Sequence, residues 1–504
     1  MAIIDGRTLA EDSELMTDIC IIGAGAAGIA IALEFANTTH KVCLIESGDL
    51  SFDQETQSLY EIENLGHPQL ESEPSRIRYF GGTTNTWTGR CLKLNPIDFE
   101  SREWVPDSGW SIPYQKLEPY YDRATKLFNI PDSQNLNSEF WQNKPISQDE
   151  KQLLSDSIDS TFSPVISLLG KSSIRFGQAY RDKLEKSLNV NICLNANVTE
   201  IEASDNLNHA VRLHLACLHG PHFFIKAKVY ILACGGLENA RLLLLSRRQN
   251  AAGLGNEFDT VGRYYMDHPK VEYGMIRMHN HNFNSPLLFG HRVARGKVQF
   301  GLRLSEEVQR QEQTLNHYVL LQPHFSPANK QPQPKSPVNK ILYNYRKFMK
   351  KPLRFNFLLV RNYLEQRPDP ESRVKLGEQR DKLGLNVLNL NWKVNSQERQ
   401  DLHRFHKVLG TYLEKHNIGQ LEQHFPADEA AQPPLFDAFH HMGTTRISDR
   451  PDKGVVDRNC RLHSVNNLFI AGSSVFPTGG HANPTLTIVA LAIRLSDHIK
   501  QVIS

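Results

Sequence analysis

No stretch of this 504-residue sequence approaches the roughly 18 consecutive apolar residues that a membrane-spanning helix needs, so we expect no transmembrane segment. The charges nearly cancel: 57 lysines and arginines against 55 aspartates and glutamates leave a net charge of +2, which argues against nucleic acid as a partner. The first residues lack the basic region and the long apolar stretch of a secretory signal. We therefore expect a protein that works in the cytoplasm.

Paired cysteines are also missing. The seven cysteines are scattered along the chain and none forms a C-x-x-C pair. An odd, dispersed set favours free thiols in a reducing compartment over a disulfide framework, and we expect no metal site. A chain of this length exceeds one ordinary hydrophobic core, so two closely joined domains are expected.

The first pattern with chemical content is a glycine-rich turn. Residues 18–22 are mostly apolar without alternation, which predicts a strand buried in a parallel sheet. Gly23, Gly25 and Gly28 follow with the spacing G-x-G-x-x-G, and a helical pattern begins behind them. The three glycines suit a tight turn, a close approach of the backbone to a pyrophosphate, and close packing of helix on strand. The helix N-terminus would direct N–H groups at the phosphates.

A second apolar strand, 41–45, ends in Glu46, where a carboxylate can accept hydrogen bonds from ribose hydroxyls. Its charge would repel a 2′-phosphate, which disfavours NADP. Because no second fingerprint of this kind occurs in the chain, FAD is favoured over NAD. A glycine-rich turn without a nucleotide remains the alternative.

A second glycine loop covers residues 81–87. Gly81 and Gly82 would let the backbone approach a planar ring, and Thr83 and Asn85 could bind the edge of a flavin or a pyrophosphate. From these residues alone, an ordinary polar loop is an equal alternative.

The C-terminal part combines a histidine, an asparagine and the start of a helix. His440 heads the spacing H-x-x-G-T, and Asn483-Pro484 precedes a largely apolar helical pattern over 485–499. An imidazole and an amide can both handle the proton of an alcohol. Asparagine is also a good helix N-cap, and proline is favoured at the first helical position, so capping alone would explain Asn483. The two interpretations are compatible.

Taken together and in this order, these motifs resemble the glucose–methanol–choline (GMC) family of flavin-dependent alcohol oxidoreductases. The resemblance covers nearly the whole chain. It implies an α/β fold with a Rossmann-like FAD-binding domain built from the discontinuous segments 1–100, 190–270 and 431–504. A second, α+β substrate-binding domain with an antiparallel sheet would comprise 101–189 and 271–430.

The resemblance also implies roles for single residues. His440 would take the hydroxyl proton as hydride passes to flavin N5, and Asn483 would be the second catalytic group. Some relatives tether the flavin through a histidine just before a tryptophan; Thr86 stands there in this chain, which predicts non-covalent FAD. Further cofactor contacts are implied for the loop from Gly81 to Asn85, Val198 near the adenine, Ala233, Gly472, Pro484 and Thr485.

Between residues 271 and 430 the pattern changes. Residues 298–304 and 388–394 alternate apolar with polar or small side chains, which predicts half-exposed antiparallel strands. Such a sheet could form a wall over the flavin or merely pack against helices, and alternation does not separate the two. His268, in a stretch that resembles the family, is expected to be structural.

No acidic residue occurs between Glu312 and Glu365. Within this interval the stretch 330–354 is basic, and residues 338–351 have the pattern of a short amphipathic helix. A solvated surface insertion, a lid, a docking site for an acidic partner and peripheral contact with a membrane all fit this pattern.

We therefore expect an FAD-dependent dehydrogenase or oxidase that acts on a CH–OH group of a sugar, glycoside or other alcohol. The sequence does not indicate the electron acceptor, which could be oxygen, a quinone or a protein. Two alternatives remain: a lyase of the same family with a structural flavin, and a flavin-containing subunit that passes electrons to a partner protein.

Overall fold

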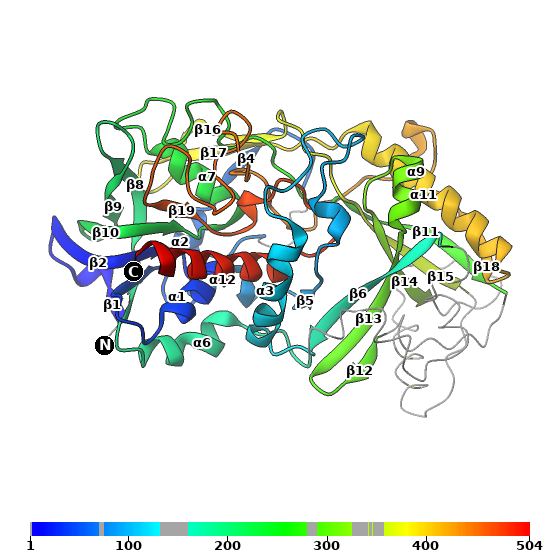
Figure 1. The fold of residues 1–504 in the computed structure, drawn as a ribbon, viewed down its shortest axis with the longest axis horizontal. Coiled ribbons are helices and arrows are strands. Elements are labelled where there is room, and N and C mark those ends of the chain that lie inside the picture. Colours follow the sequence, from blue (N-terminus) through cyan, green and yellow to red (C-terminus); the bar gives the residue numbers. More distant parts are fainter. Residues whose placement is uncertain are drawn as a thin grey trace.

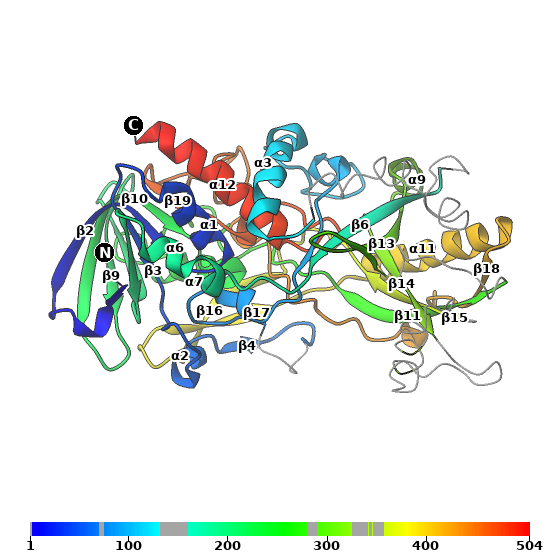
Figure 2. The ribbon, with the colours of Figure 1, turned by 90° about the horizontal axis from the view of Figure 1, so that it is seen from below.

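The chain builds two large sheets at opposite ends of an elongated molecule, with a small third sheet beside the first (Figures 1 and 2). The computed structural model describes residues 3–69, 75–131, 160–279, 290–324 and 357–503, together with Ile341 and Tyr345. The basic stretch 330–354 lies outside the described residues apart from those two, so its proposed roles stay predictions.

The first sheet carries the glycine-rich turn. Its strand order is β1-β7-β3-β2-β10-β9-β8, and β19 pairs with β10. All neighbours are parallel except β10 with β9 and β9 with β8. The strands are β1 Ile3–Asp5, β2 Ser13–Ile22, β3 Val42–Ile45, β7 Val190–Leu194, β8 Asn197–Ala203, β9 Ala210–Ala216, β10 His222–Leu232 and β19 Leu468–Ile470. The predicted strands at 18–22 and 41–45 are confirmed, and β3 is buried throughout.

Helices cover this sheet on both sides. The helix after the glycine turn, α1, is almost completely buried because it packs between the sheet, α6 and α12. α12 in turn packs against α3, whereas α7 contacts β8 and the third sheet (Figure 2). The bounds are α1 Ala26–Phe35, α2 Gln54–Ser58, α3 Tyr114–Leu127, α6 Phe176–Glu185, α7 Gly235–Leu245 and α12 Thr485–Val502.

The second sheet is antiparallel throughout, with the order β18-β11-β15-β14-β13-β6-β5 and β12 on β13. Its strands are β5 Arg90–Cys91, β6 Phe162–Gly170, β11 Lys270–Met278, β12 His291–Val293, β13 Gly296–Leu304, β14 Tyr318–His324, β15 Phe357–Tyr363 and β18 Gly419–Gln423. Helices α9 Glu306–Glu312 and α11 Ser396–Lys415 accompany it (Figure 1).

Two expectations about the strands need correction. In β13 every residue from Phe300 to Leu304 is buried, not half-exposed, because the sheet is packed on both faces there. On one face the ring of Phe162 contacts Phe405 of α11, and on the other Tyr318 contacts His481. The strand expected over 388–394 is β17 Asn386–Asn391, and it belongs to the third sheet rather than to the antiparallel wall.

In this third sheet β17 is antiparallel to β16 Arg373–Arg380 and parallel to β4 Ile62–Asn64. Two elements do not follow the domain boundaries that the family resemblance implies. β5 lies in the second sheet although it falls within 1–100, and α6 packs on α1 although it falls within 101–189. The division into two domains at those boundaries stays a prediction.

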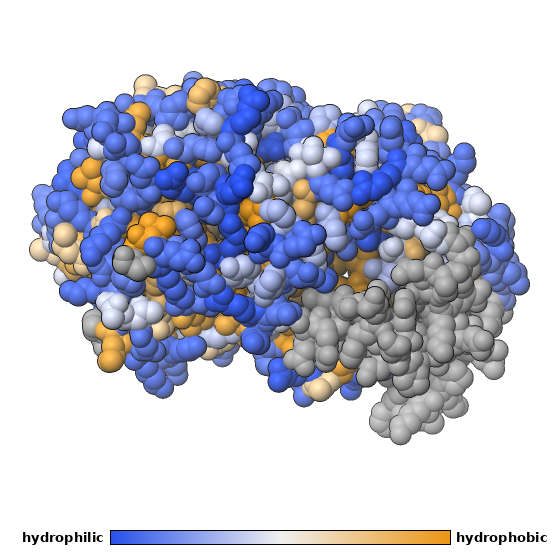
Figure 3. Space-filling view, viewed as in Figure 1, coloured by the Kyte–Doolittle hydropathy of each residue, from blue (hydrophilic) through white to orange (hydrophobic). Residues whose placement is uncertain are grey.

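The face drawn in Figure 3 is mostly hydrophilic, with apolar residues in small groups. Across the described ranges no helix is both long and apolar enough to cross a membrane.

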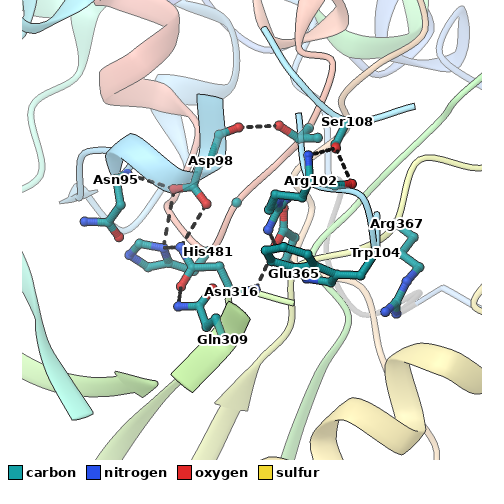
Figure 4. Close-up of polar contacts among 12 residues, drawn as sticks. Asn95, Asp98, Arg102, Trp104, Ser108, Gln309, Asn316, Glu365, Arg367 and His481 are labelled. Carbon is teal, nitrogen blue, oxygen red and sulfur yellow. Dashed lines mark hydrogen bonds and ion pairs between the residues drawn. The ribbon is translucent and has the colours of Figure 1, made fainter. Parts of the chain in front are cut away.

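A buried ionic network joins the second sheet to the segment before α12 (Figure 4). Arg102 donates from Nη1 and Nη2 to the two carboxylate oxygens of Glu365, at 2.9 and 2.5 Å, and neither side chain is exposed. The backbone N–H of Asn316 donates to the same carboxylate at 2.8 Å. Burial alone would raise the pKa of Glu365, but the Arg102 guanidinium lowers it to about 2. The pair is therefore ionised.

Asp98 and His481 extend this network. The Asn316 side chain donates to Asp98 at 2.8 Å and lies 3.2 Å from Nδ1 of His481. Burial and the charge of Glu365 raise the pKa of Asp98 to about 6. Because His481 follows Gly480 directly, the network anchors the chain just before α12.

We expect the substitution Glu365→Gln to lower the free energy of unfolding by about 3–5 kcal/mol, because it leaves the buried Arg102 charge without its partner. Urea denaturation measures this loss. The double variant Arg102→Met/Glu365→Met should lose less than the sum of the two single methionine variants, since the charge and its partner disappear together. Additive losses would show that the pair is not coupled.

Candidate active site

A cavity of about 600 Å³ lies between the first and second sheets. One part of its lining comes from Ile22, Ile45 and Ala233, at the carboxyl ends of β2, β3 and β10. The other part comes from the second sheet, through residues of β5, β6, β11 and β15. The carboxyl ends of parallel strands are where ligands bind in open α/β sheets.

The structure brings most of the predicted site residues together in this one lining. They come from eight separate stretches of the chain. The predicted residues in the lining are Gly23, Gly25, Glu46, Gly82, Thr83, Val198, Ala233, His440, Gly472, Asn483, Pro484 and Thr485.

Gly28, Gly81 and Asn85 lie outside the lining, and each has a packing role. A Cβ on Gly28 would lie 1.9 Å from the carbonyl oxygen of Gly23, so any side chain there would force α1 off the turn. A Cβ on Gly81 would lie 2.8 Å from the nitrogen of Gly177. The Asn85 amide donates to the Phe80 carbonyl at 3.0 Å. Contact of Asn85 with a cofactor stays a prediction.

The glycine turn suits a dinucleotide. Gly23 has φ +103°, a left-handed conformation that favours glycine. A Cβ on Gly25 would meet nothing within 4 Å, so this position opens into the cavity. Gly25 is also the N-cap of α1 and provides no side-chain cap, and Ala26 and Ala27 line the cavity. Their N–H groups can bind phosphate at the positive end of the helix dipole.

Glu46 is buried and held at the cavity by three donors. Its Oε2 accepts from the backbone N–H of Ala24 at 3.0 Å, and its Oε1 accepts from Gly48 N–H at 3.0 Å and Ser47 Oγ at 3.1 Å. A carboxylate has about four lone-pair sites, so capacity remains for ribose hydroxyls.

Sequence reasoning missed Arg76, Arg78 and Tyr60, which line the cavity near Glu46. The two guanidinium groups lie 4.5 and 4.6 Å from the ring centre of Tyr60. Glu238 of α7 pairs with Arg76 at 2.8 Å and with Arg78 at 3.6 Å. The signal in the sequence was the R-x-R spacing directly before the glycine loop.

His440 belongs to a chain of hydrogen bonds. Nε2 of His268 lies 2.9 Å from the carbonyl oxygen of Gly480, which can only accept, so this nitrogen carries a proton. Nδ1 of His268 lies 2.8 Å from Nδ1 of His440, and the side-chain amide of Asn483 lies 3.0 Å from Nε2 of His440.

Both imidazoles are neutral at neutral pH. Burial lowers the pKa of His268 to about 4. Burial, together with nearby His268 and Lys270, lowers the pKa of His440 well below its usual value. A neutral His268 protonated on Nε2 has a bare Nδ1, so His440 must donate from its own Nδ1. Nε2 of His440 therefore carries a lone pair and accepts from Asn483.

Asp267 fixes the backbone around both histidines. Its Oδ1 accepts from the N–H groups of His268 at 2.6 Å and Ala438 at 3.0 Å, and its Oδ2 accepts from the N–H of His440 at 3.0 Å. Burial and the charge of Asp437 raise the pKa of Asp267 to about 7, against the effect of these donors. One carboxylate thus ties together two segments that are far apart in the sequence.

Asn483 does not cap the last helix. α12 begins at Thr485, as predicted, but its N-cap is Pro484 and it has no side-chain cap. The Asn483 amide instead contacts His440. Similarly, the ring of His268, expected to be structural, lies directly on His440. The D-H-P sequence at 267–269 was the signal for this contact.

The second sheet contributes further residues that sequence reasoning missed. Lys270, Arg361, Tyr363 and Arg90 line the same cavity as His440. Within the described part of the chain, no three potential metal ligands gather at one place.

Comparison with known proteins agrees with this geometry. Residues 368–492 match the family model described as GMC oxidoreductase. The 2-methyl-1,2-propanediol dehydrogenase of Mycolicibacterium austroafricanum is 23% identical, over 96% of this chain and 95% of that protein. The fructose dehydrogenase large subunit of Gluconobacter japonicus is also 23% identical, over 96% and 98%.

Among solved structures, formate oxidase from Aspergillus oryzae, studied for the modification of its FAD, has a TM-score of 0.61 to this chain. The two are 17% identical, and the alignment covers 98% of this chain and 99% of the other. The α/β fold class is confirmed, and FAD stays the predicted cofactor. When bound, FAD would be held by the glycine turn, Glu46 and the start of α12.

The absence of a covalent link stays a prediction, based on Thr86 in the lining. Acid or heat precipitation of the purified protein should release all yellow colour into the supernatant. Absorbance of the supernatant and the pellet measures this partition. Colour that stays with the precipitated chain would reveal a covalent bond.

Proposed function

We propose, from the membership of this chain in the GMC oxidoreductase family, that it oxidises the CH–OH group of a small alcohol or sugar-like substrate. The observation that carries the proposal is the hydrogen-bonded chain from Gly480 through His268 and His440 to Asn483. It leaves the lone pair of a neutral imidazole at the cavity, where an alcohol can donate its proton.

His440, Asn483 and His268 have different roles in the proposed proton transfer. Asn483 and Nε2 of His440 are within hydrogen-bond distance of each other, so one hydroxyl can contact both. When the substrate binds, its hydroxyl replaces the Asn483 amide as the donor to Nε2 of His440. The hydroxyl proton then moves to Nε2, while the amide of Asn483 donates to the substrate oxygen. Nδ1–H of His440 keeps its bond to His268, which holds the ring in place during the transfer. FAD, when bound, supplies the hydride acceptor.

The relatives support this class of reaction, since two of them are named as dehydrogenases of a diol and of fructose. The acceptor of the electrons is a separate question, because the named relatives include both dehydrogenases and an oxidase.

Anaerobic mixing of the holoenzyme with a panel of alcohols and sugars tests the proposal through loss of the oxidised flavin absorbance. Admitting air afterwards separates an oxidase from a dehydrogenase. A bound flavin that no alcohol reduces would overturn the proposal and favour a lyase or an electron-passing subunit.

The variant His440→Ala should keep its FAD but reduce it roughly 10²–10⁴-fold more slowly with substrate, the usual value of a positioned general base. Stopped-flow absorbance measures the rate. His441→Ala is the matched control: the neighbouring ring contacts Tyr265 and is expected to change the rate less than about 10-fold, because it is not the proton acceptor. Equal losses in the two variants would remove the assignment of His440.

The rate of flavin reduction should stay high down to a pH well below 6.5, because a lowered pKa keeps His440 neutral as the pH falls. An acidic limb at or above pH 6.5 would contradict the buried, neutral base.

His268→Phe removes the acceptor of the Nδ1 proton and frees the other tautomer of His440. It should slow flavin reduction by at least about 10-fold and at most about 10⁴-fold, the cost of a catalytic imidazole in the wrong tautomer. His268→Gln keeps a donor and an acceptor and should recover part of the rate. A purely structural role would instead lower FAD content and thermal stability without changing the pH profile.

A further inference from the structure

Three cationic side chains from three strands of the second sheet line the cavity, and the charge of one of them, Lys270, acts on His440. Lys270 begins β11, Arg361 lies in β15 and Arg90 lies in β5. Lys270 is the cross-strand partner of Tyr363, and Arg361 lies two residues before Tyr363, on the same face of the sheet. Lys270, Arg361 and Tyr363 therefore form one continuous patch, named here the cationic wall.

The carboxylates that line the same cavity already have partners. Glu46 and Glu238 are the acidic residues of its lining. Glu46 is held by backbone N–H groups of the glycine turn, and Glu238 pairs with Arg76. Among the residues that the structure describes, neither carboxylate of the lining forms an ion pair with Lys270, Arg361 or Arg90.

The cations of the wall are poorly compensated. No ion pair within the described ranges includes Lys270, whose ammonium group lies 5.2 Å from the ring centre of Phe439. Arg361 pairs at the rim with Glu272, at 2.9 Å, but its buried Nε has no hydrogen-bond partner there.

Arg90, beside the wall, bonds neutral groups, at 2.5 Å to Ser167 and 2.9 Å to Gln299. All three guanidinium and ammonium groups thus retain positive charge that no lining carboxylate balances.

Partial burial makes this charge costly. Burial lowers the pKa of Lys270, against the attraction of the buried carboxylates of Asp267 and Asp437. A desolvated cation without a partner raises the free energy of the folded chain, and a bound anion that pairs with it offsets that cost. The phosphates of FAD would not meet this need, because the backbone N–H groups that would hold them, at Gly25 and Ala26, belong to the start of α1.

We propose that the cationic wall binds an oxyanion carried by the substrate, so that the alcohol oxidised at His440 also bears a carboxylate or phosphate group. Lys270 and Arg361 pair with the oxyanion while the CH–OH group lies at His440 and Asn483. The inference rests on the proposed function and names its substrate class: hydroxy acids, sugar acids or sugar phosphates.

Sets of substrates that share a skeleton but differ in charge test whether the cationic wall binds an oxyanion. Glycerol, glycerate and glycerol 3-phosphate form one set, and glucose, gluconate, glucuronate and glucose 6-phosphate another. In anaerobic flavin reduction by the holoenzyme, one charged member should exceed its neutral counterpart in kcat/KM by about 10–100-fold, the value of a hydrogen bond to a charged group. The advantage should shrink as ionic strength rises. The carboxylate and phosphate members show which oxyanion the wall accepts.

The variant Lys270→Met should lower the charged-to-neutral ratio of kcat/KM by about 10–100-fold, mainly through KM of the charged member. Lys270→Arg should recover part of that ratio. Lys375→Met is the matched control, because Lys375 is an exposed lysine of β16, outside the cavity lining. If Lys270→Met instead lowered kcat/KM equally for the charged and the neutral member, Lys270 would have a general role in the reaction, and the inference would be overturned.

A binding measurement keeps the test independent of turnover. Titration of the oxidised holoenzyme with glutarate or inorganic phosphate should perturb the visible flavin spectrum, while neutral glutaramide should not. The perturbation should weaken in Lys270→Met. Neutral alcohols that reduce the flavin while anions neither bind nor react would overturn the inference alone. If no alcohol of either kind reduces the flavin, the proposed function fails, and the anion titration still decides whether the wall binds oxyanions.

Discussion

The hydrogen bond between the Nδ1 atoms of His268 and His440 is the interaction on which the chemistry of the site depends. It decides which nitrogen of His440 is basic, because the carbonyl of Gly480 fixes the proton on the other side of His268. The three backbone N–H groups on Asp267 keep the two histidines at this distance. The buried pair of Arg102 and Glu365, with Asn316 and His481, holds the chain next to Gly480 (Figure 4). These contacts fix the orientation of His440, whose Nε2 we propose as the proton acceptor.

The second property of the cavity is its division by charge. Glu46, one of its two carboxylates, follows a strand of the first sheet and is predicted to bind the ribose of FAD, whereas Lys270, Arg361 and Arg90 belong to the second sheet. The parallel sheet thus supplies hydrogen-bond acceptors and helix N-termini for a cofactor, while the antiparallel sheet supplies positive charge for a substrate. Lys270 also affects the base, because its charge adds to burial and to the effect of His268 in lowering the pKa of His440. An anionic group on the substrate would bind beside a base that stays uncharged until it takes the hydroxyl proton.

Local patterns predicted the parts of the fold that depend on local physics. Continuous apolar runs marked β2 and β3, because a strand covered on both faces tolerates no polar alternation. Alternation was less informative in the second half of the chain. β13 alternates in sequence yet is buried because α11 covers one face and the segment before α12 contacts the other. β17 alternates too, but it pairs in a different sheet, and neither outcome can be derived from a strand by itself.

The sequence by itself determined the glycine turn, the acceptor at Glu46 and the two polar groups at His440 and Asn483, because their spacing is short and their chemistry is fixed by residue type. Only the tertiary structure decided how they work. His268 and His440 are 172 positions apart, and no local pattern could place their nitrogens 2.8 Å from each other. Likewise Lys270 and Arg361 meet only when β11 pairs with β15. The tautomer and pKa of His440, and the proposed preference for an anionic substrate, depend on such contacts. These contacts exist only once the two sheets enclose the cavity.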